Sequence, residues 1–436
     1  MIALFLAVPQ SRSLAGGTGP EVQDGIPHSL SLDEAKQIAF ARNWDLLAAK
    51  CGIDSATAQF IIAKEFPNPT ASLATSKLGS HEAGTPVGNS VWERSYDTVA
   101  AVSQLIEVAG KRHDRQEAAR AGILGARAMF LDTKRVLDQG ISKAYFAVLM
   151  AEATARNLNQ SAGYLQHEAE IGREQLKAGD LSDANLKQLE VNAEQFELQA
   201  KAADAMAAQN RIAVEVLMGE KKPRGKWTPA ERLEKLVTTY TAPAAAEPRP
   251  DAMRTDVLAA EANLRAGKAQ LELQKAYRIP DPTFSLGYEH DPPGGGPVVN
   301  TLNVGVSFPL PLWNRNGGNI KAAEAAVDQF QIALGKIKTQ AFSDFANAVV
   351  GYNEARNRFL RYRDETAPKS AKVRESVSWA YEHGAASLVD LLNAEQTDNT
   401  VRQALAQAMS DTTSAVADLI AAQTMVTEME LIPRKR

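Results

Sequence analysis

The sequence predicts a mainly α-helical protein with a small β part and an internal duplication. The same order of elements occurs twice in 436 residues: helix, Pro-x-Pro, strand, Gly-rich loop, strand, long helix, turn and returning helix. Two stretches, 112–177 and 317–382, each run for 66 residues and contain a single proline between them, Pro368. Each half also holds a pair of short segments with the apolar alternation of strands.

The duplication defines the expected organisation. One opening helical segment ends at Pro67-Asn68-Pro69 and the other at Pro280-Asp281-Pro282. A glycine, a serine, a leucine and a glutamate of the two later turns recur at a constant offset of 205, as in Gly179 and Gly384. We therefore expect a first repeat at 28–220, a linker or equatorial segment at 221–250, a second repeat at 251–428 and a tail at 429–436.

The two proline-poor stretches predict very long helices. As continuous helix, 66 residues span about 100 Å, and such a helix must pack lengthwise against others. Pro368 predicts a kink or a loosened turn in the second one. The returning segments carry heptad seams that are rich in alanine, from Leu186 to Ala207 and from Leu391 to Leu419, with Asp398 and Thr412 as polar interruptions. Helices alone do not distinguish this pattern from a soluble coiled coil.

The strands decide the class of architecture. One hairpin is expected at about 70–107 and the other at about 283–308, where Phe284, Leu286 and Tyr288 share one face. An isolated two-stranded hairpin is not stable, so its edges must pair. Four strands per chain close no barrel, whereas three chains supply twelve, an even antiparallel number of the kind that outer-membrane barrels use. We therefore expect a trimer.

Composition excludes several classes of protein. Forty-eight basic and 52 acidic residues give a net charge of −4, which argues against nucleic-acid binding. The single cysteine, Cys51, excludes an intramolecular disulfide. Long uninterrupted apolar runs are missing, so we expect no membrane-spanning helix. Residues 1–15 are interpreted as a signal peptide. Without a phosphate-binding loop, a nucleophile elbow or a zinc-protease motif, the chain is expected not to be an enzyme.

The element order as a whole resembles the TolC-like outer-membrane efflux proteins. The resemblance covers about 31–423. Its most specific pieces are the two turns, the first-hairpin exit Glu107-Val108-Ala109-Gly110-Lys111-Arg112, and the second exit Pro309-Leu310-Pro311-Leu312-Trp313-Asn314-Arg315. Within the family, the sequence as a whole most resembles the subgroup that serves heavy-metal pumps of the cobalt–zinc–cadmium type.

The resemblance implies a fold, a location and partners. It implies a homotrimer with a twelve-stranded β-barrel in the outer membrane of a Gram-negative-type bacterium and a long α-helical barrel in the periplasm. A periplasmic adaptor and an inner-membrane pump, of the RND type or another, would deliver metal ions or small toxic compounds to this passive duct. Two alternatives stay open from the sequence: a duct for type I protein secretion, and a non-membrane helical scaffold or adaptor.

The resemblance also places candidate sites at the two turns. The periplasmic tip, which would dock the adaptor, comprises Gly179, Asp180, Leu181, Ser182, Gly384, Ala385, Ala386 and Ser387. The pore gate comprises Asp390, Asn393, Arg173, Asp183 and Tyr381. Asp390 either forms a ring of carboxylates in a trimer or is an ordinary acid at a helix start. The two serines are candidate N-caps.

No cofactor and no metal site are expected. His290 lies between Glu289 and Asp291, but a tight metal site needs three or four converging ligands, so a surface position is the simpler interpretation. His383 next to the tip glycine is a candidate for a response to acid. Cys51 is not placed as the lipidated first residue of a mature chain.

Overall fold

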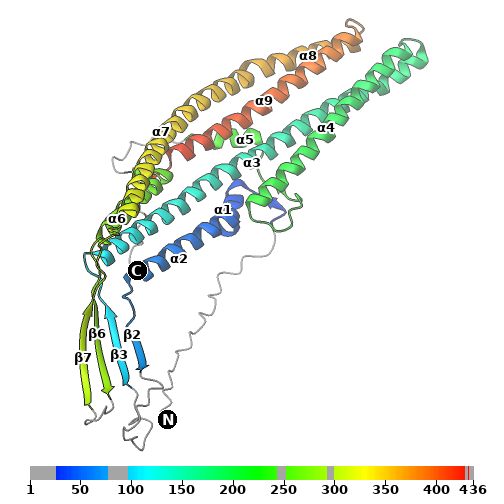
Figure 1. Ribbon diagram of the computed structural model, residues 1–436. Coiled ribbons are helices and arrows are strands. Elements are labelled where there is room, and N and C mark those ends of the chain that lie inside the picture. The colour runs from blue at the N-terminus through cyan, green and yellow to red at the C-terminus, as the bar shows by residue number, and fades with distance from the viewer. Residues whose placement is uncertain (1–25, 77–96, 243–251, 292–298, 428–430, 432–436) are drawn as a thin grey trace, which may run out of the picture.

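The computed structural model describes residues 26–76, 97–242, 252–291, 299–427 and 431. The predicted signal peptide at 1–15 lies outside the described residues, as does the tail at 429–436 except for Leu431. The chain is long and curved, with four strands at one end, the tips of two helical hairpins at the other, and packed helices between them (Figure 1).

The two halves fold into corresponding elements. The first half contains, in order, α1 (Leu32–Arg42), α2 (Trp44–Lys64), β2 (Thr70–Ser76), β3 (Asp97–Leu105), α3 (Lys111–Ala178) and α4 (Asp183–Leu217). The second half contains α6 (Thr255–Ala276), β6 (Thr283–Asp291), β7 (Val299–Ser307), α7 (Gly317–Arg361), the π-helical turn η2 (Tyr362–Thr366), α8 (Ala367–Glu382) and α9 (Leu388–Gln423). The predicted duplication is therefore confirmed as a repeat of structure.

The two long helices differ in one respect. α3 runs without interruption for 68 residues, whereas its counterpart is divided by η2 into α7 and α8. Pro368 lies at the start of α8, where its missing N–H is tolerated, and the wider turn of η2 precedes it. The loosened turn expected near this proline is therefore confirmed, and α3 has no such interruption.

Small elements form a belt around the middle of the molecule. They are β1 (Ser29–Leu30), which pairs in parallel with β4 (Thr228–Pro229), α5 (Leu233–Thr239), and β5 (Ala252–Arg254), which pairs with β8 (Met425–Thr427). Tyr145 of α3 is fully buried here, stacks on Trp227 at 5.8 Å between ring centroids, and donates its hydroxyl to Leu30 and Glu231. The linker predicted at 221–250 thus packs on α3 where it is described.

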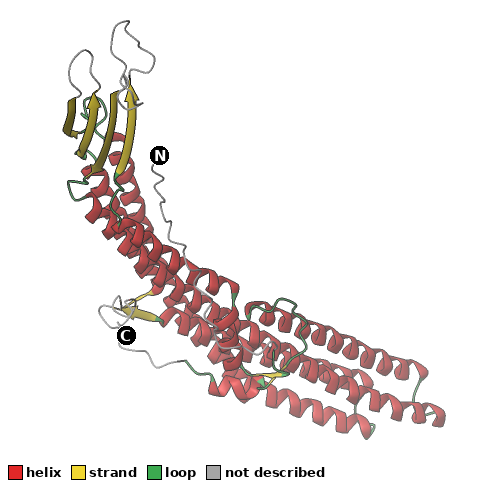
Figure 2. Cartoon of the chain, turned by 90° about the horizontal axis from the view of Figure 1, so that it is seen from below, coloured by secondary structure: helices red, strands yellow, loops and turns green. Residues whose placement is uncertain are grey.

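The four long strands form one antiparallel sheet in the order β2-β3-β6-β7 (Figure 1), at the end of the molecule away from the hairpin tips (Figure 2). The two hairpins have matching registers: Thr70 pairs with Ser103, and Thr283 with Ser307. The hairpins join through β3 and β6, where Ser103 lies opposite Ser285. β2 and β7 are the outer strands, and each has one edge without a strand partner among the described residues.

Apolar side chains hold the helices together in two main regions. Around the belt, Phe146 and Leu149 of α3 pack with Leu233 of α5. Towards the tips, Leu165 of α3, Leu189 of α4 and Leu391 of α9 pack together, and all three are buried. The predicted heptad seams are buried at most positions, because alanine lets the helix axes approach closely.

Hydropathy singles out one helix of the part of the chain that the structure describes. α2 is long and apolar enough, by length and composition, to pass as a membrane-spanning helix. Such a helix alone is weak evidence for a membrane span. Its large apolar side chains are largely uncovered: Trp44 is 56% exposed, Ile61 58% and Ile62 53%.

Candidate functional site: the hairpin tips and the exposed sheet

Both helical hairpins turn in the same way. Gly179 follows α3 with φ of +88°, and Gly384 follows α8 with φ of +72°. In this left-handed region a side chain is strained, so glycine suits both positions. In each turn the residue after the glycine donates its N–H to the carbonyl five residues back, at 2.9 Å and 2.7 Å: Asp180 to Gln175, and Ala385 to Ala380. The tips are thus closed by one repeated hydrogen-bond motif.

The returning helices begin at serine caps, in the positions chosen from the sequence. The hydroxyl of Ser182 accepts the N–H of Asn185, and that of Ser387 accepts the N–H of Asp390, both at 3.2 Å. Asp390 completes a capping box, because its carboxylate accepts the backbone N–H of Ser387 at 3.1 Å and its hydroxyl at 2.7 Å. The hydrogen bonds from Ser387 lower the pKa of the Asp390 carboxyl.

The remaining tip residues differ in burial. Asp180 and Ala385 are exposed, whereas Leu181 and Ala386 are half-buried. Leu181 is the one that packs inwards, against the apolar cluster towards the tips and over Gly172. The tips therefore present small and polar side chains on a rigid turn.

The five gate candidates do not meet within one chain. Arg173 makes an ion pair with Glu190 of α4 at 2.8 Å, inside its own hairpin. Asp183 pairs with Lys187 one turn further along α4. Tyr381 is half-buried in the apolar cluster towards the tips, where burial raises its pKa. Asp390 and Asn393 are exposed on α9. None of the ion pairs and hydrogen bonds described links two of these five side chains.

The sheet at the other end has one uncovered apolar face. Leu73 is 75% exposed and Val304 77%. Further exposed apolar side chains of the same sheet are Val102, Phe284, Leu286, Tyr288, Leu302 and Val306. A face of this kind is unfavourable in water and suits hydrocarbon, and its two free edges suit further strands.

The junction between sheet and helices is held by a buried ion pair. Lys111, at the start of α3, is 2% exposed, and its Nζ atom lies 2.7 Å from Oδ1 of Asp281. Lys111 also donates to the carbonyl of Ile279 at 2.6 Å, and Asp281 accepts the N–H of Val108 at 2.9 Å. The first hairpin's exit is thus fixed to the second hairpin's Pro-x-Pro entrance.

The sequence model of the outer membrane efflux protein family matches residues 36–220 and 251–423. The two matched segments follow the two structural repeats and cover most of the chain. The chain belongs to this family. It is accordingly an efflux channel of the outer membrane, with its helical body in the periplasm, and this decides against the non-membrane scaffold.

Relatives of this outer membrane efflux protein are named for metal resistance and cation efflux. The chain is 24% identical over 378 residues to the cobalt-zinc-cadmium resistance protein CzcC of Cupriavidus metallidurans, with 84% of each chain covered. It is 23% identical over 390 residues to the cation efflux system protein CusC of Escherichia coli K12, with 84% and 80% covered. The solved outer membrane protein VceC of Vibrio cholerae matches the fold with a TM-score of 0.70 and 18% identity, over 90% of this chain and 95% of that one.

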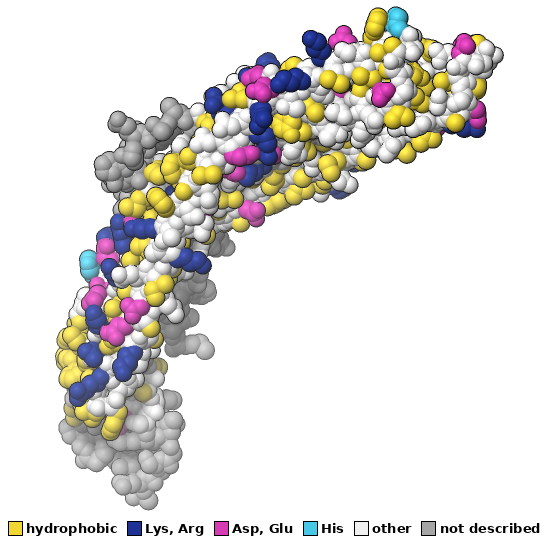
Figure 3. Space-filling model, turned by 90° about the horizontal axis from the view of Figure 1, so that it is seen from above, with side chains coloured by type: hydrophobic (Ala, Val, Ile, Leu, Met, Phe, Trp, Pro, Cys, Tyr) yellow, Lys and Arg dark blue, Asp and Glu magenta, His cyan; other side chains and the backbone are white. Residues whose placement is uncertain are grey.

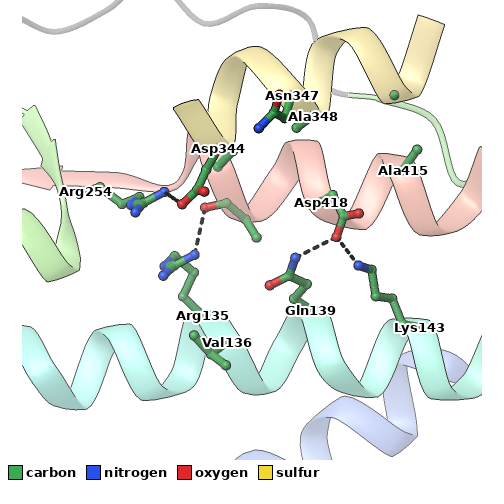
Figure 4. Close-up of a pocket in the computed structure, with 13 residues that line it drawn as sticks. Arg135, Val136, Gln139, Lys143, Arg254, Asp344, Asn347, Ala348, Ala415 and Asp418 are labelled. Atoms are coloured by element: carbon green, nitrogen blue, oxygen red, sulfur yellow. Dashed lines mark hydrogen bonds and ion pairs between the residues drawn. The ribbon is translucent and has the colours of Figure 1, made fainter. Parts of the chain in front are cut away.

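The helices of this efflux protein carry charged side chains of both signs. Acidic and basic side chains are interspersed along the face of the helices drawn in Figure 3. A pocket of about 460 Å³ lies between α3, α7 and α9 (Figure 4). Its charges are paired: Arg254 with Asp344 at 2.8 Å, and Lys143 with Asp418 at 2.5 Å. Among the described residues, no group of three or more His, Cys, Asp or Glu side chains could hold a metal ion.

Sequence reasoning missed two groups of buried charges. One is the pair of Lys111 and Asp281. The available signals were the aspartate inside the Pro-Asp-Pro motif and the lysine at the start of α3. The other lies between α3, α8 and α9 and includes Glu168 and Glu395, 4% and 1% exposed. Two signals were available there. Polar residues recur at every fourth position of α8, at Ser370, Arg374, Ser378 and Glu382, and Asp398 interrupts the apolar seam of α9.

Proposed function

We propose that three copies of this chain form a closed duct, which is the exit for metal cations in a tripartite efflux system. A periplasmic adaptor would dock at the two tips, and an inner-membrane pump of the RND type or another kind would supply the energy. The observation that carries the proposal is the four-stranded sheet with two free edges and an uncovered apolar face.

The duplication supplies the geometry of closure. Because Thr70 and Thr283 both follow a Pro-x-Pro and pair with Ser103 and Ser307, these serines are equivalent positions. Within the chain, Ser103 of the first hairpin lies opposite Ser285 of the second. If β7 pairs with β2 of the next copy in the equivalent register, Ser307 lies opposite Ser72 of that copy. Three such seams close a barrel of twelve strands.

The helices support the same arrangement. α6 packs against both long helices, α3 and α7, whereas its counterpart α2 packs mainly against α3. The apolar face that α2 leaves uncovered therefore has an equivalent partner in α7 of a neighbouring copy. In the single chain, α7 also has large apolar side chains that are uncovered: Ile332 is 73% exposed, Phe342 75% and Val350 68%. Pairing α2 with α7 of the next copy would cover both faces.

The substrate class rests on the relatives' names. CzcC is named for resistance to cobalt, zinc and cadmium and CusC for cation efflux, and each is matched over most of its length. Two measurements test the proposal. The mass of the detergent-purified protein should be that of a trimer. Deleting the gene in its host should lower tolerance to cobalt, zinc or cadmium salts, with unchanged tolerance to an organic dye as control. A monomer or dimer would contradict the duct, and unchanged metal tolerance would contradict the substrate class.

A further inference from the structure

A buried polar cluster interrupts the apolar packing between α3, α8 and α9 towards the tips. We call this group the seam cluster. It includes Tyr164, Glu168, Arg374, Ser378, Glu395 and Asp398. Tyr164 and Ser378 share a hydrogen bond that joins α3 to α8 directly. Such a set of polar groups, buried between helices that otherwise meet through leucine and alanine, needs a partner for every charge.

The arginines of this region pair with the acids of α9. Arg374 lies 3.2 Å from the carboxylate of Glu395 and 3.3 Å from that of Asp398. Arg402 makes a second ion pair with Asp398 at 2.6 Å. Glu395 also accepts the hydroxyl of Ser161. Both acids of α9 are therefore supplied with a cation.

Glu168 has no such cation among the described ion pairs, although it is only 4% exposed. The titratable groups that face it are Tyr164 on its own helix, Tyr381 and Glu382 from α8, and Glu395 from α9. α4 packs on this part of α3 through apolar side chains. Its nearby acids interact with other residues of α3: Glu190 pairs with Arg173 at 2.8 Å, and Glu197 accepts a hydrogen bond from Gln166 at 3.5 Å. His167 is the nearest base on α3, but its side chain is 69% exposed and lies 3.9 Å from Glu170.

These surroundings favour the neutral form of the carboxyl. Burial raises the pKa of Glu168, and the neighbouring acids Glu382 and Glu395 raise it further. The hydrogen bond from Tyr164 and the charge of His167 act in the opposite direction, but the net pKa is raised. Burial also raises the pKa of Tyr164 to about 12, so this phenol keeps its proton and stays a donor. An ionised carboxylate here would be both desolvated and repelled.

We propose that Glu168 binds a proton while α8 lies against α3, and that release of this proton loosens α8 from α3 near the tips. The π-helical turn η2 lies directly before α8, and Pro368 is the second residue of α8, so this helix has a place to bend. The packed state binds the proton and the loosened, hydrated state releases it. Acid therefore favours packing, and raising the pH favours separation.

The proton site lies within one chain and does not depend on the proposed trimer; its effect on exit through the duct does. Infrared spectroscopy of the full chain in detergent tests the site. Near neutral pH, the wild type should show the C=O stretch of a protonated carboxyl, and Glu168→Gln should lack it. Glu375→Gln, which changes an exposed acid on α8, should keep it. The assignment fails if the band is missing from the wild type, or if Glu395→Gln loses it while Glu168→Gln does not.

Spin labels test the movement. In a Cys51→Ser background, labels at the exposed positions Gln166 of α3 and Ser376 of α8 report their separation by pulsed electron paramagnetic resonance. The short-distance population should fall by roughly two-fold or more from about pH 6 to about pH 9 in the wild type. In Glu168→Gln, which keeps the neutral form, it should stay constant. An equal fall in both proteins, or none in the wild type, would overturn the proposal.

Discussion

The Nζ atom of Lys111 lies 2.7 Å from the Oδ1 atom of Asp281, and this pair ties the start of α3 to the entrance of the second hairpin. By the duplication, Asp281 corresponds to Asn68, and Lys111, at the start of α3, corresponds to Gly317 at the start of α7. The ion pair therefore holds the two repeats of one chain together, and the equivalent seam between copies would lack it.

Breaking this pair should destabilise the sheet end strongly. Asp281→Asn leaves Lys111 buried without an anion, at a cost of about 3 kcal/mol. Thermal unfolding in detergent should show a clear decrease in midpoint. Lys177→Met, which removes a lysine from an exposed pair with Glu174, is the control and should leave the midpoint unchanged. Equal midpoints for Asp281→Asn and the wild type would contradict this role.

The tip glycines should be intolerant of a side chain for conformational reasons alone. Gly179 and Gly384 have open space where a Cβ atom would lie, so Gly179→Ala and Gly384→Ala meet no clash and only the left-handed backbone is strained. We expect a loss of about 1 kcal/mol each. Gly163, on an exposed part of α3 with equally open space, is the matched control, because Gly163→Ala should stabilise the helix by up to about 1 kcal/mol. Chemical unfolding compares all three.

The capping box at Ser387 should make the start of α9 sensitive to acid. The hydrogen bonds from Ser387 lower the pKa of Asp390 below its usual 3.8. A lowered pKa contributes stability above the unfolded value and loses it as the pH falls through the folded value. The unfolding midpoint of Asp390→Asn should therefore lie below that of the wild type at pH 7, and the difference should shrink as the pH falls below 3.8. A difference that persists in acid would show that the carboxylate's charge is not the cause.

Conduction separates the two interpretations of Asp390. As a cap it acts on α9 alone, whereas in a trimeric ring it would attract cations into the pore. We expect Asp390→Asn to lower cation selectivity in planar bilayers, and Ser387→Ala, which loses the same capping box, to leave selectivity unchanged. If both variants conduct as the wild type does, Asp390 is a cap only.

Sequence patterns predicted the repeated order, the tip turns and the loosened turn near Pro368, because each depends on local chemistry. Gly179 favours a left-handed turn and Ser182 favours the N-cap of the next helix. Pro368 distorts a helix unless it lies in the first turn. The partners of buried charges could not be predicted in the same way. Glu168 and Glu395 lie 227 positions apart and meet only because α9 returns along α3. Arg173 and Tyr381 are both near the tips in sequence, yet their side chains have different partners.

The seam between copies tests the central claim most directly. In a Cys51→Ser background, Ser307→Cys with Ser72→Cys should give disulfide-linked multimers up to a trimer on a denaturing gel. Ser103→Cys with Ser285→Cys, the equivalent pair within the chain, should form a disulfide without change of mass. Ser307→Cys with Ala74→Cys, shifted by two residues, should link poorly. Multimers from the matched pair alone would support a barrel closed by three copies; monomers from that pair, or equal linking of the shifted pair, would contradict it.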